Sequence, residues 1–163
     1  MAVSPSVSPI PPGYHSVTPY LIVNGAARAI GFYQRAFNAT ELFRLDGPDG
    51  KIGHAEIKIG DSPVMLADEM TEGEYGYRGP QSIGGTPVSL MIYVEDVDRM
   101  FAQAVAAGAK EQRPVKDQFY GDRSGTLIDP FGHIWTIATH IEDVSPEEID
   151  ERVKKMMPAA GGA

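Results

Sequence analysis

The pattern of apolar residues and turns along this chain repeats after about 70 positions. Val94 follows Val23 by 71 positions (94 − 23), and Ile134 follows Val64 by 70 positions (134 − 64). In each half an apolar strand precedes a segment of helical spacing, and three further strands follow. A β-α-β-β-β unit of this size buries too little surface to be stable alone. We therefore expect two such modules to pack together as one α+β domain.

The first half predicts one helix and four strands. Ala26, Ile30 and Tyr33 recur at the spacing of one helix face, and Asn24 before them is a candidate cap. We expect strands over residues 15–23, 40–45, 51–59 and 64–68.

The second half repeats this order. A helix is expected between Asp96, which can cap it, and Gly108, which can end it. The dipeptide Gly121-Asp122 predicts a tight hairpin, and Asp129-Pro-Phe-Gly132 carries the residue preferences of a type I turn. We expect strands over residues 88–94, 115–120, 124–128 and 134–139.

The remaining segments divide the chain further. Residues 1–13 are rich in serine and proline and carry no charged side chain, which predicts a mobile arm. A single domain is expected over residues 14–144, with module one at 14–68, a Gly-rich linker at 69–86 and module two at 87–144. Ser145-Pro-Glu-Glu148 predicts the start of a C-terminal helix, so that residues 145–163 form this helix and a loose tail.

Composition excludes several classes of function. The net charge of −8 over 163 residues argues against nucleic acid or an anionic membrane surface as a partner. No stretch approaches the roughly 20 apolar residues that a membrane-spanning helix needs. Because the chain has no cysteine, disulfides, thiolate metal sites and a thiol nucleophile are excluded. With no basic start followed by an apolar run, a cytoplasmic protein is expected.

Five short motifs together resemble one known family. They are Ala29-Ile-Gly-Phe-Tyr33, Asp129-Pro-Phe-Gly-His-Ile-Trp135, Thr18-Pro-Tyr-Leu21, Gly53-His-Ala-Glu56 and Tyr120-Gly-Asp-Arg123. The chain resembles the glyoxalase/bleomycin-resistance/dioxygenase (vicinal oxygen chelate) superfamily over residues 14–144, with its nearest likeness to the PhnB-like branch. The resemblance implies paired βαβββ modules whose sheets curve into a cup. It implies much less about activity, because one fold supports many functions.

Metal-dependent members of this family carry a ligand in the first and last strand of each module. The resemblance maps these four positions to Thr18, Leu66, Ser89 and Thr136. A divalent ion needs imidazole or carboxylate donors, and none of the four supplies one. We therefore expect no metal at the usual site and no cofactor, which argues against glyoxalase-type and ring-cleaving chemistry.

Strand alternation predicts the lining of the cup. Tyr20 shares a face with Thr18, while Met91 and Tyr93 share one with Ser89. His54 and Glu56 lie two apart on one strand, where they can act as a base and its orienting partner or hold a displaced metal. The alternative is a solvated polar pair or a structural hydrogen bond.

Three more residues are candidates for ligand contact. Phe119 and Tyr120 can stack on a planar ligand, although core packing explains them almost as well. Arg123 can bind a carboxylate or phosphate in bidentate fashion, or pair with a nearby aspartate.

Three interpretations of function follow. The leading one is a metal-independent protein that binds a small organic molecule, as a resistance or sequestering factor. The second is a lyase or isomerase that uses His54 and Glu56 or an atypical metal site. The third is a protein-interaction module whose cup is filled by its own side chains. The resemblance also implies a homodimer.

Overall fold

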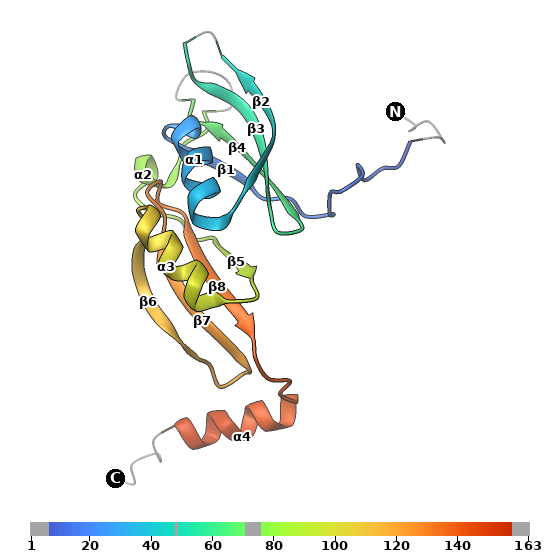
Figure 1. Ribbon diagram of the computed structural model, residues 1–163, viewed down its shortest axis with the longest axis vertical. Helices are drawn as coiled ribbons and strands as arrows, with labels where there is room; N and C mark the ends of the chain where they lie inside the picture. Colours follow the sequence, from blue (N-terminus) through green and yellow to red (C-terminus); the bar gives the residue numbers. More distant parts are fainter. Residues whose placement is uncertain (1–6, 48, 71–75, 158–163) are drawn as a thin grey trace.

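The chain folds into two four-stranded sheets, each covered by one helix, in a computed structural model that describes residues 7–47, 49–70 and 76–157. Figure 1 shows the two modules one above the other, with helices α1 and α3 on the same side of the sheets. The predicted α+β architecture of two βαβββ modules is confirmed.

The boundaries of the elements follow the repeat. Module one contains β1 (Tyr20–Val23), α1 (Ala26–Phe37), β2 (Thr40–Asp46), β3 (Ile52–Ile59) and β4 (Ser62–Asp68). Module two contains β5 (Ser89–Tyr93), α3 (Val97–Ala107), β6 (Lys110–Asp117), β7 (Asp122–Ile128) and β8 (Ile134–His140). The short helix α2 (Pro80–Ile83) lies in the predicted linker, and α4 (Pro146–Met156) follows module two.

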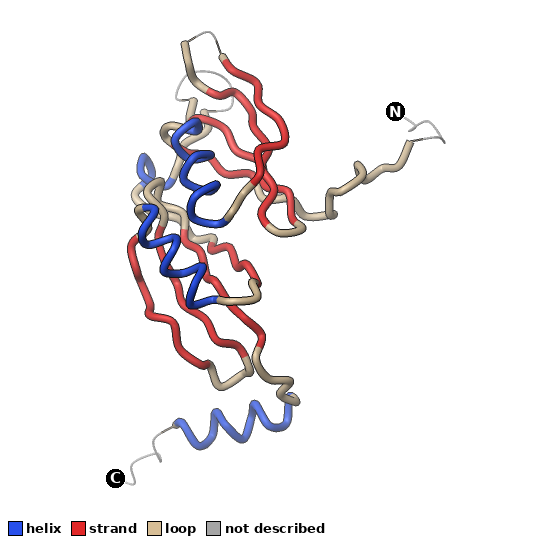
Figure 2. The backbone as a smooth tube through the Cα atoms, in the orientation of Figure 1, coloured by secondary structure: helices blue, strands red, loops and turns tan. Residues whose placement is uncertain are grey.

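Both sheets have the same topology. The strand orders are β1-β4-β3-β2 and β5-β8-β7-β6, and only the first pair of each sheet is parallel. Figure 2 shows the helix of each module lying across one face of its sheet. We call the other face of each sheet its open face. Since side chains alternate between faces, every strand contributes to both the core and the open face.

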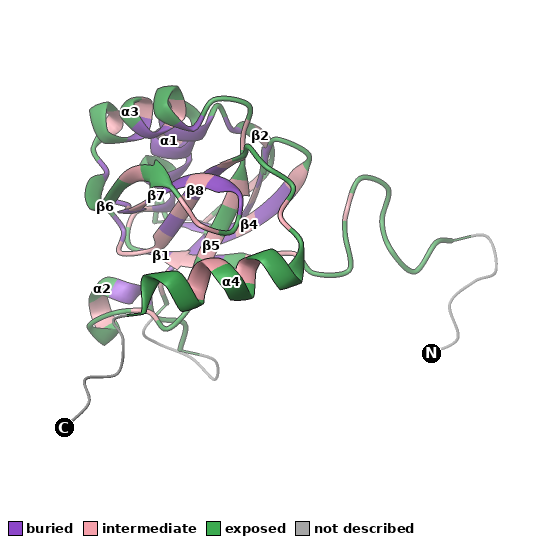
Figure 3. Cartoon of the chain, turned by 90° about the horizontal axis from the view of Figure 1, so that it is seen from below, coloured by how far each residue is buried: buried purple, intermediate pink, exposed green. Residues whose placement is uncertain are grey.

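The core lies between the helices and the sheets. On β3, Ala55 and Ile57 are fully buried, whereas His54 and Glu56, which alternate with them along the strand, remain partly exposed. On α1, Ile30 and Tyr33 are buried one helical turn apart, as their spacing predicts. Figure 3 shows buried residues gathered on the strands and on the inner side of the helices, whereas α4 has none.

Each module caps its helix from its last strand. Asp68 of β4 accepts hydrogen bonds from Gly25 N (2.7 Å), Ala26 N (2.9 Å) and Ile52 N (2.8 Å). At the equivalent place in module two, Thr139 Oγ1 accepts one from Val97 N (2.9 Å). The prediction that Asn24 caps α1 is wrong. Gly25 occupies the cap position, and the side chain that accepts from the first amides of the helix comes from β4. These bonds satisfy amides that a helix start leaves unpaired.

Helices α1 and α3 pack against each other and join the modules. The amide nitrogen of Gln103 on α3 lies 2.8 Å from Arg35 O and 2.9 Å from Asn38 Oδ1 at the end of α1. Asn38 adopts a left-handed conformation (φ 54°), which is common in the residue that ends a helix. The Gln103 amide therefore donates hydrogen bonds to two oxygens at the end of α1 that would otherwise face the module boundary unpaired.

Asp129 joins the modules a second time. It is 4% exposed and accepts hydrogen bonds from Tyr33 Oη on α1 (2.7 Å) and from Trp135 Nε1 (2.9 Å). Its other oxygen accepts from Phe131 N (2.8 Å) and His133 N (3.0 Å), which closes the turn between β7 and β8. The predicted type I turn thus also anchors module one.

The β6–β7 hairpin differs from the prediction. Strand β6 begins at Lys110 and ends at Asp117, and the turn spans residues 118–121 instead of centring on Gly121-Asp122. Gln118 N donates to Asp122 O (2.7 Å), and Gly121 adopts a φ of +100° that favours glycine. The prediction missed the start of β6 because this exposed edge strand is almost entirely polar and shows no alternation.

The ends of the chain complete the fold. Residues 7–13 of the predicted arm are exposed and form no helix or strand, while residues 1–6 and 158–163 lie outside the described residues. Helix α4 is held to the β6–β7 turn by Arg152, which donates to Phe119 O (3.0 Å) and pairs with Glu142 (2.7 Å). Ser145 caps α4 as predicted, since its hydroxyl accepts from Glu148 N (3.2 Å).

Candidate functional site

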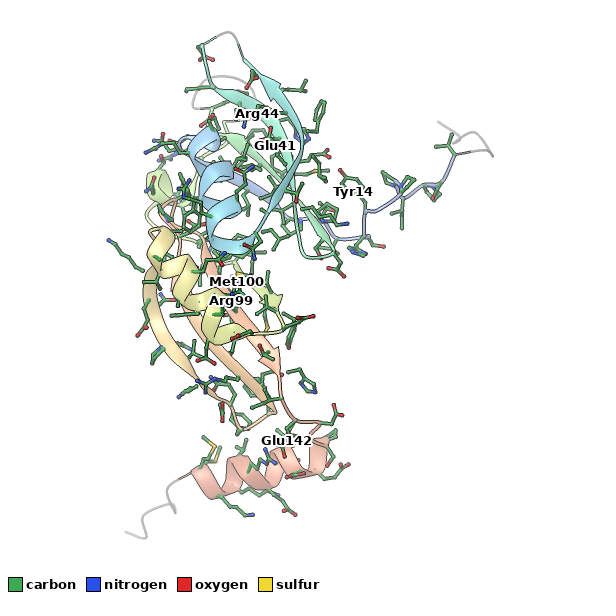
Figure 4. All side chains as sticks on the ribbon, viewed as in Figure 1. Tyr14, Glu41, Arg44, Arg99, Met100 and Glu142 are labelled. Carbon is green, nitrogen blue, oxygen red and sulfur yellow. The ribbon has the colours of Figure 1, made fainter. Side chains whose placement is uncertain are left out.

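A chain of hydrogen bonds crosses the open face of module one. The Tyr20 hydroxyl lies 2.8 Å from His54 Nδ1, and His54 Nε2 lies 3.1 Å from Glu56 Oε1. Tyr14 donates its hydroxyl to the other oxygen of Glu56. Figure 4 shows Tyr14 on the N-terminal segment where it passes the sheet. We call Tyr14, Tyr20, His54 and Glu56 the module-one cluster.

Hydrogen bonding keeps Glu56 ionised. The bond from Tyr14 lowers the pKa of Glu56, and the bond from His54 lowers it further. A carboxylate can only accept, so His54 Nε2 carries a proton and donates to it. In neutral His54 the other nitrogen, Nδ1, then accepts from Tyr20. Burial raises the pKa of Tyr20, which keeps that hydroxyl protonated. The two predicted candidates His54 and Glu56 are thus in contact.

Apolar side chains surround this cluster. Phe43 of β2 is 46% exposed and its ring centroid lies 6.3 Å from that of His54. A register shift between Glu41 and Phe43 makes Leu42 an extra residue in β2 and places Phe43 opposite Glu56. Leu45, opposite His54, is also exposed. The face offers an anionic oxygen within an apolar and aromatic surface, which suits a small organic ligand.

The open face of module two is rich in hydroxyl groups. Ser89 and Thr136 line a pocket of about 460 Å³ together with Thr126. The hydroxyls of Thr126 and Thr136 lie 3.1 Å apart on neighbouring strands. Met91 and Tyr93 follow Ser89 on the same face of β5 and are exposed. The structure therefore brings these predicted residues to one face, apart from the module-one cluster.

A second polar cluster lies at one end of the open face of module two. Asp122 is 4% exposed and accepts from Tyr93 Oη (2.8 Å), while His140 Nδ1 lies 2.8 Å from its other oxygen. His140 Nε2 lies 2.8 Å from Asp143. Sequence reasoning missed Asp122 and His140 as a pair because Asp122 was assigned to a turn. Its place opposite His140 follows only from the register of β7 and β8.

The His140 contacts should depend on pH. The bond to Asp143, and then that to Asp122, raises the pKa of His140 above its usual value of about 6.5. A raised pKa means that the stabilisation is complete below about pH 6.5 and is lost as pH rises through the folded-state value. We expect amide hydrogens of residues 141–145 to be less protected at high pH than near pH 6 after correction for intrinsic exchange rates. The variant His140→Gln should remove this dependence, and equal pH dependence in both proteins would contradict the prediction.

Two predicted binding residues lie on the wrong face. Leu66 is fully buried opposite Leu21 in the core. Glu56 of β3 pairs with Met65, nine positions on (65 − 56), whereas Thr126 of β7 pairs with Thr136, ten positions on (136 − 126). The equivalent of Thr136 is therefore Met65, and this one-residue slip reverses the face of Leu66. Arg123 faces α3, where it pairs with Asp98 (2.8 Å) and Asp117 (2.8 Å).

The remaining candidates lie at the edges of the open faces. Phe119 and Tyr120 form the tip of the β6–β7 hairpin, with ring centroids 5.2 Å apart at 86°. Thr18 is partly buried just before β1, and its hydroxyl lies 3.4 Å from His15 O. These three residues lie at a hairpin tip and at the start of a strand.

The donor set at the family's metal positions does not fit a divalent ion. With the register corrected, these positions hold Thr18, Met65, Ser89 and Thr136, which supply hydroxyls and a thioether. Divalent ions in such sites bind imidazole and carboxylate. Within the described ranges no group of three His, Cys, Asp or Glu residues is placed to hold a metal.

A groove of about 1420 Å³ lies between the modules. Apolar side chains from both modules line it, among them Phe37, Leu90, Ile92, Met100 and Trp135. Tyr93 and His140 lie at its border with the open face of module two. Figure 4 shows Arg99 and Met100 on α3 where it approaches module one. The groove exceeds the roughly 300–1,000 Å³ of a typical small-ligand pocket.

No helix in the described part of the chain is both long enough and apolar enough to cross a bilayer.

Two open-faced sheets, each backed by a helix and carrying polar groups on the uncovered side, define a paired-module α+β protein. The sequence model of the Glyoxalase/Bleomycin resistance protein/Dioxygenase superfamily matches residues 13–137. This chain belongs to that superfamily, as the motif resemblance predicts.

Known relatives agree with this assignment. An uncharacterized protein of Mycobacterium bovis is 44% identical over 135 residues, which are 82% of this chain and 89% of that protein. The crystal structure of TioX from Micromonospora sp. ML1 is 26% identical with a TM-score of 0.60, covering 80% of this chain and all of that one (100%). A PhnB protein from Bacillus cereus shares the fold, with 18% identity and a TM-score of 0.60 over 77% of this chain and 99% of that one.

Proposed function

We propose that this protein binds a small organic molecule on the open faces of its sheets without a metal ion at the family's usual positions, as a resistance or sequestering factor. One observation carries the proposal. The four metal positions hold no imidazole or carboxylate, yet the open faces keep exposed aromatic side chains, including Tyr20, Phe43 and Tyr93. A cup filled by its own side chains would bury these rings. Their exposure therefore argues against the interaction-module alternative.

A second candidate function rests on the module-one cluster. His54 is oriented by Tyr20 and Glu56 on its two nitrogens, as a base is oriented by its partners in acid–base catalysis. A lyase or isomerase of the same superfamily could use this pair without a metal. If substrate displaced Tyr20 from Nδ1, that nitrogen would accept a proton while Glu56 stabilised the imidazolium.

The binding proposal can be tested by identifying the metals and small molecules that stay bound to the protein through purification. Wild type, His54→Ala and Glu56→Ala would be purified without chelators, then analysed for metals and, after denaturation, for released compounds by mass spectrometry. We expect far less than one metal ion per chain. We also expect a bound compound whose retention falls tenfold or more in both variants, because a hydrogen bond to a charged group contributes roughly 1.5–3 kcal/mol.

The matched control is Glu147→Ala, which removes an exposed glutamate of α4 outside the cluster. It should retain the compound, and all three variants should melt close to wild type. One metal ion per chain together with a metal-dependent thermal shift would overturn the proposal in favour of the enzyme.

We further propose that the protein is a cytoplasmic homodimer. β1 and β5 are edge strands, and the groove between the modules is lined by β5 and by the segment just before β1, so a second copy could cover these edges and the groove. Sedimentation equilibrium should give twice the mass of one chain, and Met91→Glu on the exposed part of β5 should weaken the association. A monomer at micromolar concentration would contradict the dimer.

A further inference from the structure

Strand β6 carries charges of both signs and sorts them to opposite faces. Its three cations lie directly opposite open-face residues of β7: Lys110 opposite Ile128, Arg113 opposite Thr126, and Lys116 opposite Ser124. Its acids lie opposite residues of the other face: Glu111 opposite Leu127 and Asp117 opposite Arg123. Directly paired residues of antiparallel strands point to the same side. The open face of module two therefore has a row of positive charge in a chain of net charge −8.

Two bulges produce this separation. Between Glu111 and Arg113, β6 advances two residues while β7 advances one, and between Arg113 and Lys116 it advances three while β7 advances two. Without the first bulge, Arg113 would lie opposite Gly125, whose position packs against Phe101 of α3. The extra residues thus turn the Arg113 guanidinium away from the core and towards the hydroxyl groups of β7 and β8.

The row meets the hydroxyl-rich pocket of about 460 Å³ already described. Its polar lining is Thr86, Ser89, Gln112, Arg113, Thr126 and Thr136. Hydroxyls, an amide and a guanidinium can all donate hydrogen bonds, and no carboxylate lines the pocket. The pocket is therefore chemically complementary to an anion.

Arg113 differs from the arginines that pair with carboxylates. Arg44, Arg123 and Arg152 are all paired with carboxylates. Within the part of the chain that the structure describes, Arg113 has no ion pair and no side-chain hydrogen bond. Its fork of donors is thus available to a ligand, and such a fork matches the oxygens of a phosphate group.

We propose that this pocket binds the tetrahedral oxyanion group, a phosphate, phosphonate or sulfate, of the protein's small-molecule ligand. The inference rests on the proposed binding function and names the chemical class of the ligand. Arg113 supplies charge and paired donors, while Ser89, Thr126 and Thr136 supply hydroxyl donors from three strands. The pocket is far larger than the anion alone, which leaves room for an organic part against Val88 and Ile134.

The test uses inorganic phosphate, methylphosphonate and sulfate, titrated calorimetrically into the full-length protein at constant ionic strength, with acetate as the planar control. We expect saturable 1:1 binding of the three tetrahedral anions, with a dissociation constant on the order of 1 mM for such fragments, and no saturable binding of acetate. Arg113→Gln should weaken binding tenfold or more, and Thr136→Val several-fold. Arg113→Lys should restore only part of the affinity, since lysine keeps the charge but loses the fork.

Arg35→Gln is the matched control, because Arg35 is exposed on α1 and its replacement makes the same change in net charge. It should bind phosphate as wild type does. The inference is overturned if wild type shows no saturable binding, or if Arg35→Gln weakens binding as much as Arg113→Gln.

The two proposals can fail separately. If phosphate does not bind but a compound is retained by wild type and lost in His54→Ala, only the oxyanion pocket is wrong. If phosphate binds through Arg113 but wild type retains no compound, the proposed function fails and the anion site stands.

Discussion

Replacing Asp129 with alanine should cost about 3–5 kcal/mol of unfolding free energy, because it removes the acceptor of a buried, charged hydrogen-bond network. Asp129 accepts from two side chains and two backbone amides, and it is 4% exposed. Its loss leaves Tyr33 Oη and Trp135 Nε1 without their acceptor inside the core. Urea unfolding followed by circular dichroism would measure the effect.

Two comparisons make the Asp129 experiment specific. Tyr33→Phe removes one of the four bonds and should cost only about 1–2 kcal/mol. Asp150→Ala removes an exposed aspartate of α4 and should stay within about 0.5 kcal/mol of wild type. A loss below about 1 kcal/mol in Asp129→Ala would show that the turn does not depend on this carboxylate. Since Tyr33 belongs to module one, the variant should also loosen the modules against each other.

Replacing Asp68 with alanine should cost about 2–4 kcal/mol, because three backbone amides lose their acceptor at once. Two of them begin helix α1 and the third belongs to Ile52 of β3. Within the repeat, Thr139 is the equivalent residue and accepts from one amide only. Thr139→Val should therefore cost less, about 1 kcal/mol.

The comparison of the two caps contains its own control. Both substitutions remove the side-chain oxygens that accept hydrogen bonds near the end of the last strand of a module. They therefore differ chiefly in the number of backbone amides left unpaired. Asp68→Asn keeps one acceptor oxygen and should fall between Asp68→Ala and wild type. Equal losses in Asp68→Ala and Thr139→Val, measured by urea unfolding, would contradict this explanation.

The sequence predicted the fold well because the repeat and the periodicity act locally. The alternation of β3 correctly placed His54 and Glu56 on one side, and the residues that alternate with them, Ala55 and Ile57, are buried on the other. Helical spacing identified Ile30 and Tyr33 as core residues. These patterns are properties of residues close together in the sequence, so they can be recognised without knowing which residues meet in the folded protein.

The site was harder to predict, because it depends on register. A single extra residue between the paired positions of β7 and β8 moved Leu66 from the predicted cup into the core. Arg123 was offered as a ligand anchor, but its partner Asp98 lies on another element, 25 positions away. The same holds for Asp122 and His140, which meet only through strand pairing. Pairings of this kind are not visible in local patterns.

The bulges have a consequence for how such a face can change over generations. Phe43 and Arg113 stand 70 positions apart (113 − 43), each just beyond the first bulge of the outer strand of its module. Phe43 places an aromatic ring, and Arg113 a guanidinium, at equivalent positions on the open faces of the two modules. If β6 paired regularly after Glu111, Gln112 would lie opposite Thr126 and Arg113 opposite Gly125, so the guanidinium would turn behind the sheet with no alteration of the arginine itself. Relatives that keep these residues but pair them without the bulge would thus differ in ligand preference while keeping every charged side chain.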